Sequence, residues 1–348
     1  SEEGTVCSIC IDAPELNTPE LYSGRLSMVA TTSNLSTIPI IDFQPFLLGD
    51  DRAQRQVARQ LYQACHEIGF MYVQQIGIDR DLVAAAFHQS HRFFALPLAA
   101  KQALAYPDAF SNRGYAGMER ERLDPNQPGD LKETFNLGLD GAESPDATNP
   151  ALTQNCWPPG DEEFRNTLVS LFTACTEAAN QILQAFALAL NLPLSFLVDR
   201  HRKQEHTLRL LHYPPLQQPP KPGQTRAGAH SDYGSMTLLF QDQVGGLEVQ
   251  TTQGDWIAAP AIPDTVLVNT GNIMQRWSND VFRSTRHRVA VPTCDRRHLS
   301  RYAIAFFCQP DHDAEVSCIP ECQGPNNPAK YPPILAGDYL VSLLQATY

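Results

Sequence analysis

The 348-residue sequence lacks an apolar run of about 18 residues or more, the length that a membrane-spanning helix needs. It also lacks an excess of basic residues, since 26 Lys and Arg stand against 38 Asp and Glu, a formal net charge of −12. Because non-specific binding to nucleic acids or anionic membranes requires basic surfaces, we expect neither partner. Hydrophobic residues still make up 43% of the chain, which is enough for a large globular core.

The nine cysteines are odd in number and scattered, and no signal peptide is recognisable before them. This usage is typical of reduced proteins, so we expect a cytoplasmic chain. Cys7 and Cys10 have the spacing of a metal or redox pair, but no second pair accompanies them. Such a motif needs a structural context, so we assign it no function.

Hydrophobic periodicity divides the chain into a helix-rich first half and a β-rich second half. Helical spacing follows Asp51 up to Gly69, and a longer helix is predicted from Asp161 to about Leu190. From Thr207 on, short apolar runs such as LRLLHY, MTLLFQ and RYAIAFF alternate with Gly, Pro and Asn, which predicts an antiparallel jelly roll. The predicted fold class is therefore α+β, a jelly-roll core with supporting N-terminal and central helices. The predicted regions are a flexible tail (1–36), an N-terminal region of helices, short strands and long loops (37–160), a spine helix and connector (161–205), the jelly-roll core (206–312) and a C-terminal segment with a helix (313–348).

The stretch AGAHSDYGSMTLLF, residues 227–240, carries the first chemical signal. His230 and Asp232 are two residues apart, and alternate side chains of a strand point to the same face. An imidazole beside a carboxylate supplies two of the three ligands of a 2-His-1-carboxylate iron site. A short motif of this kind also occurs by chance, so its weight depends on the residues that follow.

Two later residues complete the pattern. His287 opens the apolar strand HRVAV and is the best candidate for the third metal ligand. Arg301 opens the strand RYAIAFF, which places its guanidinium at the mouth of a mostly apolar barrel. A buried cation is costly unless it is paired, and the planar guanidinium is suited to a carboxylate. We therefore expect an acidic ligand at Arg301.

His230-x-Asp232, His287 and Arg301 together resemble the site of the iron(II)/2-oxoglutarate-dependent dioxygenases, in the branch that contains isopenicillin N synthase. The similarity runs from Ile38 to the C-terminus and implies a double-stranded β-helix, the jelly roll of that superfamily. LRLLHYP and HSDYGSMTLLFQD look closest to thymine 7-hydroxylase-like enzymes. Other supporting stretches are NRGYAG (112–117), LKETFNLG (131–138), RWSND (276–280) and STRHRV (284–289).

The resemblance implies a reaction and its cofactors. It implies Fe(II) held by His230, Asp232 and His287, and 2-oxoglutarate bound by Arg301 and Tyr213, with O₂ as the other cosubstrate. The implied enzyme is a dioxygenase that hydroxylates or desaturates a small organic molecule while 2-oxoglutarate is converted to succinate and CO₂.

The sequence departs from the family pattern at two positions near the cosubstrate. Ala303 stands where the family usually has a serine that bonds the distal carboxylate, and Leu211 stands where plant members carry an asparagine. A neutral hydrogen bond is worth about 0.5–1.5 kcal/mol, so we expect weaker cosubstrate binding without loss of activity.

Substrate recognition is predicted less sharply. A nucleobase competes with a flavonoid-like molecule or another secondary metabolite as the substrate, and His206 differs from the asparagine expected for a pyrimidine enzyme. Tyr233 would line the site only if a bulge or turn swings it inward. The candidate substrate-binding residues are Tyr233, Arg209, Phe307, Asn112 and Arg113.

Two other interpretations of the His/Asp/His set stay open at the level of sequence. One is a non-enzymatic jelly-roll protein that binds a small molecule or a metal, although structural zinc normally takes four protein ligands. The other is a metal-dependent hydrolase, which has no use for Arg301. Under any of the three interpretations, we expect a monomer or a weak homo-oligomer.

Overall fold

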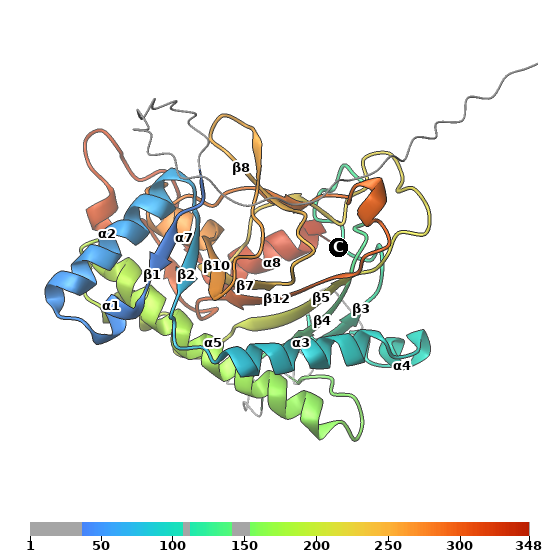
Figure 1. The fold of residues 1–348 in the computed structure, drawn as a ribbon. Coiled ribbons are helices and arrows are strands. Elements are labelled where there is room, and N and C mark those ends of the chain that lie inside the picture. Colours follow the sequence, from blue (N-terminus) through green and yellow to red (C-terminus); the bar gives the residue numbers. More distant parts are fainter. Residues whose placement is uncertain (1–36, 107–111, 141–153, 348) are drawn as a thin grey trace, which may run out of the picture. The chain divides into compact units, whose positions relative to one another are not determined.

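Two large β-sheets, a small two-stranded sheet and a layer of helices make up the computed structural model, which describes residues 37–106, 112–140 and 154–347 (Figure 1). The predicted flexible tail, 1–36, lies outside the described residues. Within these ranges, none of the helices combines the length and the hydrophobicity that crossing a bilayer demands.

The larger sheet has eight strands, and all neighbouring pairs are antiparallel except β1 with β2. Strands from the first 140 residues occupy both edges, so the N-terminal region extends the same sheet that the later strands build. In spatial order the strands are β1 (Ile40–Asp42), β2 (Phe70–Gln74), β10 (Thr265–Thr270), β7 (Met236–Gln241), β12 (Arg301–Cys308), β5 (Thr207–Tyr213), β4 (Glu133–Leu137) and β3 (Gly114–Ala116).

The smaller sheet has four strands, in the order β6 (Ala227–His230), β11 (His287–Val289), β8 (Leu247–Gln250) and β9 (Trp256–Ala258). One apolar cluster joins it to the larger sheet, with Val249 and Val289 from one side and Leu211, Ala303 and Ala305 from the other. The two sheets therefore enclose a common interior. This arrangement is the predicted α+β jelly roll.

The helices cover the opposite face of the larger sheet, where α3 (Arg80–Phe94) and α5 (Glu162–Ala189) run beneath β12 and β5 (Figure 1). α2 (Asp51–Glu67) packs against α5 and β2. Each of these helices begins after an aspartate whose carboxylate accepts a hydrogen bond from a first-turn N–H, the expected N-cap. The other helices and the third sheet are α1 (Gln44–Leu48), α4 (Leu98–Gln102), α6 (Ser195–Val198), α7 (Asn272–Trp277), α8 (Ala336–Thr347), β13 (Glu315–Val316) and β14 (Ile334–Leu335).

Strand alternation on β12 assigns each side chain to one of two environments. Ile304 and Phe306 belong to the apolar cluster shared with the helices, whereas Ala303 and Ala305 belong to the cluster between the sheets. Arg301 shares the face of Ala303, because both are odd-numbered on the same strand. The fold therefore turns Arg301 toward the interior of the jelly roll.

Candidate metal centre

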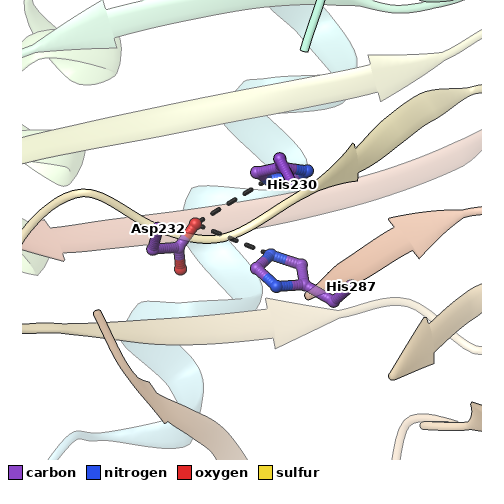
Figure 2. Close-up of side chains that lie close together, drawn as sticks. All are labelled: His230, Asp232 and His287. Carbon is purple, nitrogen blue, oxygen red and sulfur yellow. Dashed lines mark ion pairs between the residues drawn. The ribbon is translucent and has the colours of Figure 1, made fainter. Parts of the chain in front are cut away.

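Three side chains from neighbouring segments converge between the sheets (Figure 2). His230 ends β6, Asp232 lies in the irregular segment that follows, and His287 begins β11 directly opposite His230. Asp232 Oδ1 lies 3.8 Å from His230 Nε2 and 3.5 Å from His287 Nε2. In the part of the chain that the structure describes, this is the one group of three or more His, Cys, Asp or Glu that could hold a metal ion.

Backbone carbonyls set the tautomer of both imidazoles. His230 Nδ1 lies 2.7 Å from the carbonyl oxygen of Gly228, and His287 Nδ1 lies 3.1 Å from that of Thr285. Because a carbonyl can only accept, each Nδ1 carries the proton and donates it. The lone pair of each Nε2 is thus left facing Asp232, as a metal ligand requires.

The environment favours the protonation states that a metal needs. Burial, followed by the neighbouring His287, lowers the pKa of His230, so its imidazole stays neutral. Burial works against ionisation of Asp232, but the two histidines and hydrogen bonds from Asn269 and Thr237 lower the pKa of this carboxyl below its usual range. Two imidazoles and one carboxylate are the donor set of a non-haem Fe(II) site, so the residues fit that ion.

A buried cation lies at one end of the same interior. Arg301 is 1% exposed, and its Nη2 donates to Gln241 Oε1 at 2.8 Å. The guanidinium lies 4.8 Å from the ring centroid of Tyr213, and Nε has no hydrogen-bond partner. No Asp or Glu of the described ranges forms an ion pair with Arg301. Since a buried charge requires a counter-ion, the site fits an acidic ligand.

A second arginine adds to the positive potential of this end. Arg226 is also 1% exposed, and it donates to the carbonyl oxygens of Leu299 at 2.8 Å and Pro214 at 3.3 Å. Burial, followed by the neighbouring Arg301, lowers the pKa of Arg226. Arg226 is thus close enough to feel the charge of Arg301, but it does not line the cavity that Arg301 lines.

A cavity of about 140 Å³ connects the metal triad to Arg301 and Tyr213. Four of the candidate substrate-binding residues also line it, namely Tyr233, Arg209, Phe307 and Asn112. β6 ends at His230, and the chain is irregular over residues 231–235, with a bend that begins at Tyr233. Tyr233 lines the cavity and also packs against the apolar cluster shared with the helices.

Arg113 behaves differently from the other candidates. It does not line the cavity but donates through Nη1 to the carbonyl oxygen of Asn112 at 3.0 Å and to Thr207 Oγ1 at 3.2 Å. Arg113 therefore supports two residues that do line the cavity.

A charged cluster on the cavity wall was not predicted from the sequence. Lys132 Nζ lies 2.7 Å from Asp130 Oδ2 and 3.2 Å from Glu121 Oε2, and Glu121 also pairs with Arg209 at 3.2 Å. Burial opposes the charge on Lys132, but Asp130 and Glu121 raise its pKa above the usual value. The sequence indicated this cluster only through the stretch LKETFNLG, which contains Lys132 but does not show which carboxylates pair with it.

Comparison with known proteins places this site in a family context. Residues 38–160 match the N-terminal region of non-haem dioxygenases in morphine synthesis, and residues 204–310 match the 2OG-Fe(II) oxygenase superfamily. The chain is 33% identical over 318 residues to the 2-oxoglutarate-Fe(II) type oxidoreductase hxnY of Emericella nidulans, covering 89% of this chain and 90% of the relative. It is 33% identical over 322 residues to the proline hydroxylase buaE of Petromyces alliaceus, covering 88% and 98%.

A solved structure shows the same fold. The crystal structure of full-length Neurospora crassa thymine 7-hydroxylase in complex with alpha-KG and thymine superposes with a TM-score of 0.81 and 35% sequence identity. The match covers 89% of this chain and 97% of the Neurospora enzyme.

Proposed function

Because the chain belongs to the 2OG-Fe(II) oxygenase superfamily, we propose that His230, Asp232 and His287 hold its iron, and that Arg301 and Tyr213 bind its 2-oxoglutarate. The enzyme is a 2-oxoglutarate-dependent dioxygenase. This membership excludes the two alternative interpretations, a non-enzymatic binding protein and a metal-dependent hydrolase. Bound ferrous iron supplies the redox chemistry that couples decarboxylation of 2-oxoglutarate, to succinate and CO₂, with oxidation of a small organic substrate by O₂.

The convergence of two Nε2 atoms on Asp232 Oδ1 is the observation that carries the proposal. Three ligands on one side of a metal leave the other positions free for a chelating 2-oxo acid and for O₂. Arg301 binds and orients the distal carboxylate of the 2-oxo acid, and Tyr213 packs against the same guanidinium. The cosubstrate is thereby aligned before the substrate reacts.

The rest of the cavity orients the substrate and excludes water. Leu239, Leu247 and Val289 give it aliphatic walls, which keep bulk water away from the reacting groups. Phe307 and Tyr233 add aromatic surface close to the triad, and we propose that they pack against the substrate. Asn112 and Arg209 supply polar groups that would fix its orientation. We propose a small substrate such as a nucleobase rather than an extended flavonoid-like one, because the cavity has a volume of only about 140 Å³.

The substitution His230→Ala tests the function. We expect the variant to lose iron-dependent conversion of 2-oxoglutarate to succinate, because two ligands hold the metal too weakly. His312→Ala is a matched control, since His312 is exposed and paired with Glu205 at 3.7 Å outside the cavity. Succinate formation by His230→Ala at the wild-type rate would refute the proposal.

We also propose a cytoplasmic enzyme that acts as a monomer or weak homo-oligomer and does not bind nucleic acid. The net charge of −12 supports the last point, and the free state of the cysteines in the described ranges supports the first. Sedimentation of the purified protein, alone and with DNA, would test the oligomeric state and the expected absence of binding.

A further inference from the structure

The two oxygens of Asp232 lie in different environments. Oδ1 faces both histidines, whereas Oδ2 accepts hydrogen bonds from Asn269 Nδ2 at 2.7 Å and from Thr237 Oγ1 at 2.5 Å. Both donors are nearly fully buried, with Asn269 2% and Thr237 3% exposed, so water does not compete for these bonds. Oδ2 is therefore occupied by protein donors before any metal binds.

The segment that supplies Asn269 also holds the backbone around Asp232. The N–H of Asn272 donates to the carbonyl oxygen of Asp232 at 2.8 Å, and the N–H of Ile273 donates to that of Gly234 at 3.1 Å. A Cβ atom at Gly271 would lie 2.3 Å from the Gly234 carbonyl oxygen, so only glycine permits this approach. The junction of β10 and α7 thus fixes both the main chain and the side chain of the carboxylate.

A carboxylate can bind a metal through one oxygen or through both. Two charge-assisted hydrogen bonds engage the lone pairs of Oδ2 and stabilise the orientation in which only Oδ1 points at the histidines. Binding through both oxygens would break these bonds and use one more metal position. A chelating 2-oxo acid and O₂ together need every position that three single-atom ligands leave free.

We propose that Asn269 and Thr237 are positioning residues that restrict Asp232 to ligation through Oδ1 and so preserve the position that the 2-oxo acid needs. The inference rests on the proposed metal site. It assigns to the two side chains a role in cosubstrate binding although they bond to Asp232 and not to Arg301.

The test measures binding, separately from turnover, in full-length protein. Thr237→Val keeps the shape of the side chain and removes the hydroxyl, whereas Thr237→Ser keeps the hydroxyl. Thr134→Val is a matched control, because Thr134 is a buried threonine of the same sheet whose hydroxyl has no partner. Each protein is loaded with Co(II) without oxygen, and its Co(II) affinity, visible spectrum and affinity for 2-oxoglutarate are recorded.

We expect Thr237→Val to bind Co(II) about 10–100-fold more weakly, as is usual when a partner of a metal ligand is lost. Its Co(II) spectrum should change, and its 2-oxoglutarate affinity should fall at least roughly tenfold relative to wild type. Thr237→Ser and Thr134→Val should match wild type in all three measurements. Asn269→Leu should change the same three measurements in the same direction as Thr237→Val. If Asn269→Leu does not fold, the result for Thr237→Val is sufficient to test the proposal.

The outcomes separate this inference from the proposed function. Unchanged Co(II) spectrum and 2-oxoglutarate affinity in Thr237→Val, with Co(II) binding lost in His230→Ala, would overturn the role of Thr237 and leave the metal site intact. Co(II) binding that survives His230→Ala would overturn both.

Discussion

Replacing Arg301 by methionine separates cosubstrate binding from folding. Arg301 is 1% exposed, makes one side-chain hydrogen bond, to Gln241, and has an Nε without a partner. Removing one member of a buried charge pair costs about 3–5 kcal/mol, because the other charge is left uncompensated. At 1.4 kcal/mol per tenfold change, Arg301→Met should weaken 2-oxoglutarate binding by roughly 10² to 10³-fold or more.

The ligand-free protein should respond in another way. There the guanidinium has no carboxylate to lose, so exchanging it for an apolar side chain of similar length should leave the free energy of unfolding almost unchanged or raise it. Wild type with 2-oxoglutarate at 100 times its Kd should gain about 2.7 kcal/mol, and the variant should gain almost nothing at that concentration.

Titration calorimetry with Mn(II)-loaded protein and unfolding with and without 2-oxoglutarate would measure both effects. Arg200→Met is a matched control, since the Arg200 guanidinium also lies over an aromatic ring, 3.8 Å from the Phe196 centroid, but outside the cavity. An Arg301→Met protein that binds 2-oxoglutarate within about threefold of wild type would refute the assignment of the distal carboxylate.

Three further predictions follow from single side chains. Ala303→Ser should restore a hydroxyl beside Arg301 and strengthen 2-oxoglutarate binding by about 2- to 12-fold, the equivalent of one neutral hydrogen bond; calorimetry showing weaker binding would contradict this. Phe307→Ala should lower substrate-stimulated succinate formation at least roughly tenfold while the substrate-independent rate persists, and equal losses in both assays would argue against a substrate contact. Burial works against ionisation of Glu133, but hydrogen bonds from His212, Lys101 and Tyr115 lower the pKa of this carboxyl. The ionised Glu133 therefore stabilises the fold fully above the unfolded-state pKa of about 4.3. This stabilisation is lost as the pH falls through the lower pKa of the folded state. Glu133→Gln should therefore destabilise the protein more at pH 7 than near pH 3, and an unfolding difference that is the same at both pH values would exclude this linkage.

Local patterns were sufficient to predict the main helices and most strands. Asp50, Asp79 and Asp161 each precede a stretch of helical apolar spacing, and each accepts a hydrogen bond from a first-turn N–H, as N-cap residues do. α7 was not predicted because its six residues are too few to display a period. The contacts of α7 with the segment around Asp232 are made by backbone N–H groups of α7, and backbone contacts cannot be recognised from residue types.

The candidate site could be predicted only where chemistry and periodicity coincide. His230 and Asp232 combine metal-ligand types with strand spacing, and His287 begins an apolar strand. Asn269 lies near the end of an apolar strand, but its side chain acts on Asp232 through a sheet pairing that the sequence does not display. The contacts of Lys132 with Asp130 and Glu121 were not predicted either, because a polar loop gives no periodic signal.

The position of the site depends on the packing of the opposite face of the larger sheet. On β5, β7 and β12, one set of alternate residues packs against the helices and includes Leu210, Leu238 and Phe306, while the other set lines the cavity. A register slip of one residue would exchange the two sets, placing Arg301 and Thr237 against α3 and α5 and opening the apolar residues to the cavity. The free energy of burying the helix-facing side chains therefore excludes that slip. The cavity gains its geometry from a core that contacts neither the metal nor the cosubstrate.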